Sequence, residues 1–298
     1  MRSRPVVRPV PLILALTLLV GCSHSAATNA APSGQGPAGA VGPSVSAGPS
    51  VSASGPASAT PPTSTPTPTA TPTPATLGTV VLIPGYGGSV EGLATIAAAL
   101  RKAGRHVKVV ALPAQASQTF ERQALTLEAV VRAEEKAGRG PVDIVAHSNG
   151  GVLARYWARH FKGAGRARVI LTLGAPQHGT QLADLAFSAA PQLCTPACGE
   201  VRPSSAFLKA LNASADTAGI AWISAYTDND DVVTPPTSAL LPGAVNVRLQ
   251  AVCSGAVIDH AGLLGDPLAL GLVLDELQSP SVHAVGPADC TRLRTLGA

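Results

Sequence analysis

The sequence predicts an α/β protein, with a mostly parallel central sheet flanked by helices. Short apolar runs alternate along the chain with segments of helical periodicity, which is the pattern of strands joined by crossover helices. The runs are apolar nearly throughout, as expected for strands covered on both faces. A third observation limits the folded part: no charged side chain occurs between Arg8 and Glu91. We therefore predict a single domain over residues 78–298.

The elements follow in chain order. Six apolar runs predict strands, at Thr79–Ile83, Val107–Leu112, Val142–Ala146, Arg168–Leu173, Ile220–Tyr226 and Val245–Leu249. Five segments with helical periodicity predict helices, at Val90–Ala103, Phe120–Ala137, Gly151–Phe161, Ala206–Leu211 and Leu268–Leu277.

Residues 1–22 predict an export signal. Three arginines within the first eight residues precede the apolar run Leu12–Val20, which is too short to span a bilayer as a stable helix. The run leads into Leu19–Cys22, which resembles a bacterial lipobox. The interpretation we favour is that Cys22 is diacylated and anchors the protein to the outer face of the cell membrane. The alternative is cleavage near Ala26, which would discard Cys22 and release a secreted protein.

Residues 23–77 consist almost entirely of Ala, Ser, Gly, Pro and Thr. They contain too few large apolar side chains to offset the entropy of ordering, so we expect a disordered tether. The Thr-Pro alternation at Thr60–Pro74 predicts a stiffer, polyproline-like end to this tether.

The charge balance excludes one class of function. The chain carries 21 basic and 17 acidic residues, and 18 basic residues remain once Arg2, Arg4 and Arg8 of the signal are set aside. A nearly neutral domain does not bind nucleic acid by neutralising phosphates, so we expect no nucleic-acid partner.

The cysteines predict disulfides. Besides Cys22 the chain has four, and an even number in an exported protein favours two bridges over free thiols. Three pairings are possible. We favour Cys194–Cys198 with Cys253–Cys290, because the residues between Cys194 and Cys198 already suggest a turn.

The strongest functional signal is the segment Val142–Gly151. An apolar strand ends, Ser148 follows after His147, two glycines come next, and a helical pattern begins. This is the context of a nucleophile elbow, in which a sharp turn between strand and helix exposes the serine hydroxyl. The small residues that such a turn needs on either side of the serine are Ala146 and Gly150. We expect His147 to pack against or support the site.

A serine nucleophile needs a histidine to accept its proton and a carboxylate to orient that histidine. In the chain order serine, acid, histidine, an acidic cluster follows the predicted fifth strand and His260 follows the sixth. The cluster offers Asp228, Asp230 and Asp231 as candidates for the acid. We expect His260 to be the base.

Four segments together make residues 78–298 resemble the small bacterial lipases of the α/β-hydrolase superfamily, the lipase class 2 group. They are Ile83–Ser89, Ala146–Gly151, Leu173–Thr180 and Asp259–Leu264. The resemblance implies an α/β-hydrolase fold. It also selects Asp230 as the acid, because in that family the acid is followed by any residue, then an aliphatic residue, then a valine, which here are Asp231, Val232 and Val233.

The resemblance also implies an oxyanion hole. The backbone N–H groups of Tyr86 and Asn149 would form it, and Gly85, Gly87 and Gly88 would let the first loop approach the substrate. The family's usual His-Gly at the end of the first strand is Pro84-Gly85 here, a change that main-chain donors tolerate.

We therefore expect a lipase or esterase that cleaves esters with apolar acyl groups. Residues Gln181–Ala206 would form a minimal lid, and we expect no cofactor, no metal and a monomer. Two alternatives remain: an acyltransferase that uses the same acyl-enzyme, and a surface-binding lipoprotein with an inactive hydrolase fold. The complete Ser-Asp-His set argues against the second.

Overall fold

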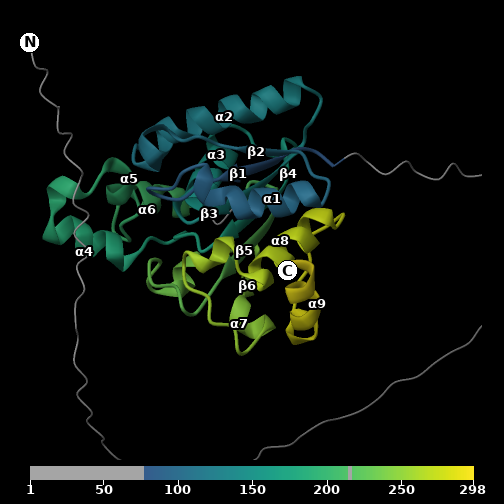
Figure 1. Ribbon diagram of the computed structural model, residues 1–298. Helices are drawn as coiled ribbons and strands as arrows, with labels where there is room; N and C mark the ends of the chain where they lie inside the picture. The colour runs from purple at the N-terminus through teal and green to yellow at the C-terminus, as the bar shows by residue number, and fades with distance from the viewer. Residues whose placement is uncertain (1–76, 214–216) are drawn as a thin grey trace, which may run out of the picture. The chain divides into compact units, whose positions relative to one another are not determined.

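A computed structural model describes residues 77–213 and 217–298 (Figure 1). The predicted signal, the lipobox Cys22 and the tether up to residue 76 lie outside the described residues. These assignments therefore stay predictions from the sequence.

The core of the domain is one six-stranded sheet with strand order β2-β1-β3-β4-β5-β6. Every neighbouring pair runs parallel. The strands are β1 (Val80–Ile83), β2 (Val107–Val109), β3 (Val142–His147), β4 (Ala167–Leu173), β5 (Ala221–Tyr226) and β6 (Val245–Arg248). This confirms the predicted α/β class, and all six predicted strands are present.

Two strands end earlier than predicted. The run that was expected to continue to Leu112 stops as a strand at Val109, and the chain enters the short 3-10 helix η2 (Pro113–Ala116). The last strand ends at Arg248, because Leu249 already begins a helical turn. Apolar residues continue past the strand in both places, which is why the pattern overestimated the strand lengths.

Nine α-helices are assigned in the described part of the chain. They are α1 (Ala94–Lys102), α2 (Phe120–Lys136), α3 (Asn149–His160), α4 (Gln181–Ala189), α5 (Pro196–Glu200), α6 (Ala206–Asn212), α7 (Leu249–Val252), α8 (Pro267–Gln278) and α9 (Cys290–Leu296). Short 3-10 helices are η1 (Glu91–Leu93), η2, η3 (Pro191–Leu193), η4 (Pro236–Ala239), η5 (Gly262–Leu264) and η6 (Pro287–Asp289). The five predicted helices correspond to η1 with α1, and to α2, α3, α6 and α8, whereas α4, α5, α7 and α9 were not predicted.

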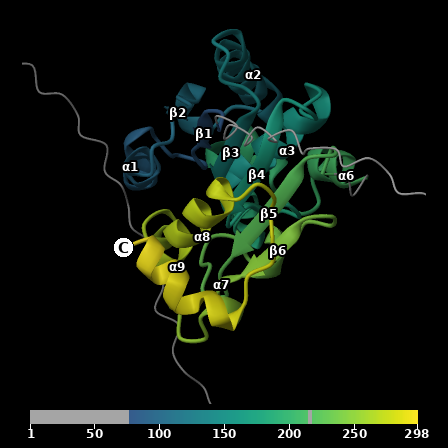
Figure 2. The same ribbon diagram turned by 90° about the vertical axis from the view of Figure 1, so that its right-hand side faces the viewer.

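The sheet has an apolar layer on each face. Alternate strand residues such as Leu82 and Leu171 pack with side chains of α1, α8 and α9. Their neighbours, such as Ile83 and Ile170, pack with α2, α3 and α6, including the fully buried Trp157. Figure 2 shows α1, α8 and α9 on one side of the sheet and α2, α3 and α6 on the other. This two-sided burial explains why the strands are apolar throughout.

A buried ionic cluster lies at the amino edge of the sheet. Asp143 near the start of β3 is fully buried, and its carboxylate accepts from Arg105 at 2.6 Å and from Arg168 at 2.7 Å. Both guanidinium groups also donate to the carbonyl of Leu277, near the end of α8. The carboxyl-terminal end of α8 is therefore fixed at the amino edge, and the opposite edge is left for the site.

The cysteines are joined as Cys194–Cys198 and Cys253–Cys290, the pairing that the sequence favoured. The first bridge joins Cys194, directly after η3, to Cys198 within α5, and the second connects the end of α7 to the start of α9. Across residues 77–213 and 217–298, no helix has both the length and the apolar character needed to cross a bilayer.

Candidate active site

Ser148 stands alone between β3 and α3, in a backbone conformation that L-residues rarely adopt (φ 54°, ψ −131°). Its N–H donates to the carbonyl of Leu173 at the end of β4 (2.9 Å), which fixes the turn against the neighbouring strand. In a nucleophile elbow, the strained residue of the sharp strand-to-helix turn is the nucleophile. The predicted elbow is therefore present at Ser148.

The glycines around the turn allow the close backbone approaches that it requires. A Cβ on Gly150 would lie 2.7 Å from the carbonyl oxygen of Pro84, and one on Gly151 would lie 2.4 Å from the Ala175 Cβ. On the facing loop, a Cβ on Gly85 would lie 2.7 Å from the Ser148 Cβ. Such contacts are too short for any side chain, so these three positions need glycine.

Asp230 and His260, the residues expected to be the acid and the base, are in contact. Asp230 lies in the turn after β5, and its Oδ2 is 2.9 Å from Nδ1 of His260. The other carboxylate oxygen accepts from the backbone N–H groups of Val232 (3.0 Å) and Val233 (2.7 Å). Because Oδ1 is held by the main chain, Oδ2 is left for the imidazole. Both side chains are buried.

The two other candidate acids have different partners. Asp228 is exposed and pairs with Arg248 at 3.3 Å. Asp231 accepts a hydrogen bond from the backbone N–H of His260 (3.3 Å), not from its ring. Only Asp230, of the three, contacts the imidazole that could serve as base.

The two predicted oxyanion donors belong to segments next to Ser148: Asn149 follows it in the chain, and Tyr86 follows Gly85, which approaches the Ser148 Cβ. Asn149 is the first residue of α3, so its N–H has no hydrogen-bond acceptor within the helix. It also lies at the positive end of the helix dipole. Tyr86 lies in the turn after β1, and within the described residues its N–H donates to no backbone carbonyl. Gly87 takes a positive φ of 68°, and a Cβ on Gly88 would lie 2.9 Å from the carbonyl oxygen of Gly85. This turn therefore depends on glycine.

A cavity of about 480 Å³ opens above the serine. Ser148, Asn149, Tyr86 and His260 all line it. The remaining wall is mostly apolar, with side chains from η1, α4, η3 and η5 that include Leu93, Leu182, Ala186, Leu193 and Leu264. The segment that was expected to form a lid is thus helical, and α4 supplies part of the cavity wall.

Two histidines stand side by side in the site. The His147 ring lies 4.5 Å from the His260 ring, centroid to centroid. Burial, together with the positive charge that His260 acquires on protonation, lowers the pKa of His147 to about 4. His147 is therefore neutral at neutral pH.

Gly174, which sequence reasoning did not single out, lies against the acid-base pair. A Cβ there would be 2.9 Å from Asp230 Oδ2 and 3.2 Å from His260 Nδ1, and the residue has a φ of 56°. The available signal was a glycine directly after a predicted strand, inside the Leu173–Thr180 segment.

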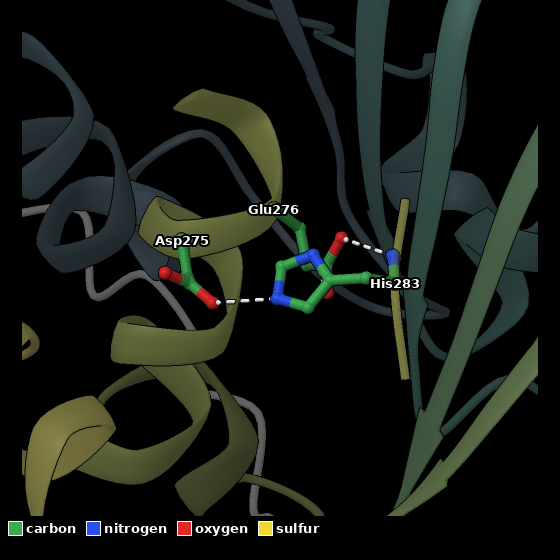
Figure 3. Close-up of side chains that lie close together, drawn as sticks. All are labelled: Asp275, Glu276 and His283. Carbon is green, nitrogen blue, oxygen red and sulfur yellow. Dashed lines mark hydrogen bonds and ion pairs between the residues drawn. The ribbon is translucent and has the colours of Figure 1, made fainter. Parts of the chain in front are cut away.

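One group elsewhere has the residue types of a metal site. Asp275 and Glu276 of α8 lie beside His283, with Asp275 Oδ2 3.3 Å from Nε2 of the ring (Figure 3). All three side chains already have partners: Asp275 pairs with Arg292, and His283 lies between the carboxylates of Asp275 and Glu276. The guanidinium of Arg292 disfavours a cation here. The cluster also lies towards the end of α8, at the edge of the sheet away from Ser148.

Comparison with known proteins gives structural likenesses only. No family model matches the chain, and no curated protein matches it. Among solved structures, Aspergillus fumigatus lipase B is similar with a TM-score of 0.63 and 22% identity, over 75% of this chain. The chain spans only 58% of the length of that lipase.

The likeness extends over most of the length of two other solved structures, one bacterial and one from a study of metagenome-derived enzymes. The mature form of Bacillus licheniformis lipase BlEst2 is similar with a TM-score of 0.58 and 20% identity, over 70% of this chain and 95% of that one. A structure from a report on the metagenome-derived lipolytic enzymes LipS and LipT has a TM-score of 0.51 and 19% identity, over 68% and 95%. Together with the parallel sheet and the elbow, these likenesses show that the chain has the α/β-hydrolase fold.

Proposed function

We propose that the protein is a serine hydrolase that cleaves carboxylic esters with apolar acyl groups. The observation that carries the proposal is the arrangement at one cavity: a strained Ser148 at its base, and His260 on its wall with Nδ1 held by Asp230 at 2.9 Å. The fold alone would not support this, because it hosts many functions.

The chemistry follows from the positions of these groups. Ser148 Oγ attacks the ester carbonyl while His260 Nε2 accepts its proton. Asp230 keeps the proton of the ring on Nδ1 and stabilises the imidazolium that forms. The N–H groups of Tyr86 and Asn149 receive the negative charge on the carbonyl oxygen, and each such donor contributes about 3 kcal/mol to the transition state. His260 then protonates the leaving alcohol, and water hydrolyses the acyl-enzyme.

The apolar wall of the cavity is the reason to propose that the acyl group of the ester binds there. Leucine and alanine side chains from α4 and the neighbouring segments surround it, and few polar groups interrupt them. Burying acyl methylene groups against such a wall contributes about 0.8 kcal/mol for each CH₂. A panel of p-nitrophenyl esters of increasing acyl length would measure this preference, and an oil interface would distinguish a lipase from an esterase.

Ser148→Ala is the direct test. We expect it to abolish both turnover of p-nitrophenyl esters and labelling by a fluorophosphonate. Ser89→Ala is the matched control, because Ser89 lines the same cavity but lies outside the elbow. Activity retained by Ser148→Ala, or lost equally in both variants, would reject the assignment. Adding an alcohol as a competing acyl acceptor would show whether the acyl-enzyme favours acyl transfer over hydrolysis.

We also propose that the enzyme works at the cell surface, tethered through Cys22. This rests on the sequence of residues 1–77 alone. Mass spectrometry of the mature N-terminus tests it, since an unmodified start beyond Cys22 would end the anchor proposal.

A further inference from the structure

His147 contacts the proposed base through the backbone of that residue. Its Nε2 lies 3.0 Å from the carbonyl oxygen of His260. A carbonyl oxygen can only accept a hydrogen bond, so Nε2 carries the proton and donates. The two residues are far apart in the sequence, and this bond joins the end of β3 to the loop before η5.

His260 has no regular secondary structure of its own to hold it. It lies in the loop between α7 and η5, and three groups fix it. Asp231 accepts from its N–H at 3.3 Å, Asp230 accepts from its ring, and His147 donates to its carbonyl. The first two contacts come from the turn after β5. The third comes from the residue next to Ser148. Among the hydrogen bonds of His260 within residues 77–213 and 217–298, it alone connects the base to the strand that ends beside the nucleophile.

The charge state of His147 suits this role. The ring is buried against His260, and the carboxylate of Asp230 is the charged group nearest to the pair. A neutral His147 retains its Nε2–H donor. It also adds no second positive charge beside His260 when that ring takes the proton of Ser148.

We propose that His147 is a positioning residue, whose hydrogen bond to the His260 carbonyl holds the base at the distance from Ser148 that proton transfer requires. This inference rests on the proposed ester hydrolysis. His147 also lines the cavity, but in this role it acts on the reaction through the backbone of His260. Its effect should therefore appear in kcat and not in substrate binding.

Two substitutions separate the hydrogen bond from the space that the ring fills. His147→Phe keeps a buried ring but removes the donor, whereas His147→Gln retains an amide N–H that can reach the same carbonyl. With kcat expressed per active site titrated by fluorophosphonate, we expect His147→Phe to lower kcat about tenfold or more with KM within about twofold. His147→Gln should keep kcat within about threefold of wild type. Expressing kcat per titrated site removes the effect of any misfolded fraction.

The outcomes are distinct. Equal kcat in His147→Phe and wild type, or equal losses in the Phe and Gln variants, would overturn the positioning role while the Ser148→Ala result leaves the proposed function standing. A folded wild type without ester turnover would overturn both. Should His147→Phe fail to fold, nitrogen NMR of the wild type gives a second test. We expect a neutral His147 ring with the proton on Nε2 at pH 6, and a proton on Nδ1 alone would reject the proposal.

Discussion

Thr195 Oγ1 donates a hydrogen bond of 3.1 Å to the phenol oxygen of Tyr86. This contact joins the loop after β1, which carries a proposed oxyanion donor, to the turn enclosed by the Cys194–Cys198 bridge. Leu193 and Cys198, on either side of that turn, both line the cavity. The side chain of Tyr86 thus contacts the cavity rim, while its backbone N–H is the group proposed for the chemistry.

Tyr86→Phe separates these two roles. The substitution removes the hydrogen bond to Thr195 but leaves the backbone N–H in place. Because the donor is a main-chain group, we expect kcat on a short ester to stay within about threefold of wild type, whereas loss of an oxyanion donor costs about 100-fold or more. Steady-state kinetics on p-nitrophenyl acetate check this. A fall as large as that of a lost donor would place the phenol, not the amide, in the reaction.

The two disulfides should affect different properties. Cys194→Ser with Cys198→Ser opens a bridge between residues four apart, beside Leu193 on the cavity wall. Removing this bridge should lower kcat/KM for long acyl esters relative to short ones, because the segment that carries Leu193 is then no longer fixed at the cavity wall. The chain-entropy relation gives about 2 kcal/mol of lost stability for so small a loop.

Cys253→Ser with Cys290→Ser is the matched comparison. That bridge spans 37 positions, and the same relation gives about 4 kcal/mol. It lies between α7 and α9 and does not line the cavity. We expect a larger loss in urea denaturation with an unchanged ratio of long to short esters. Equal effects of the two pairs on acyl preference would contradict the assignment of the first bridge to the cavity wall.

Gly174→Ala should damage the acid-base pair directly. The new methyl group would lie 2.9 Å from Asp230 Oδ2 and 2.7 Å from Leu263 Cδ1, at a residue with positive φ. We expect kcat to fall about tenfold or more, along with a destabilisation of about 1–2 kcal/mol from the backbone. Gly104→Ala controls for the backbone effect, since Gly104 has a φ of 80° and open space around it. Full activity in Gly174→Ala would mean that the pair tolerates displacement.

The sequence predicted the parts of the site that local pattern determines. Ser148 was found because an apolar strand, two glycines and a helical pattern surround it within a short segment. His260 was found by its order in the chain. Choosing Asp230 over Asp228 and Asp231 needed the family pattern, since all three stand in one turn and only tertiary contacts distinguish their partners.

The rest depended on contacts that no local pattern encodes. Helix α4 was missed because its small and apolar residues do not show a clear polar face, and part of it borders the cavity instead of packing into the core. The hydrogen bond from His147 to the backbone of His260 spans 113 positions and uses a carbonyl that every residue has. No residue type at position 260 could have indicated it.

The buried His147 also predicts how stability responds to acid. Its pKa is lowered from 6.5 to about 4, chiefly by burial, so the folded state binds its proton less readily than the unfolded state. Between pH 6.5 and about 4, the imidazole of His147 is protonated in the unfolded chain but neutral in the folded protein. The free energy of unfolding therefore falls as the pH falls. At about 1.4 kcal/mol for each pH unit, the wild type should lose about 3 kcal/mol of its free energy of unfolding across this window relative to His147→Gln, which has no imidazole at this position. Urea denaturation of both proteins at pH 7, 5 and 4 measures the difference, and His178→Gln, which removes an exposed histidine, controls for the loss of one imidazole. A difference between wild type and His147→Gln that stays constant with pH would show that His147 is hydrated and free to protonate in the folded protein, contrary to its burial against His260.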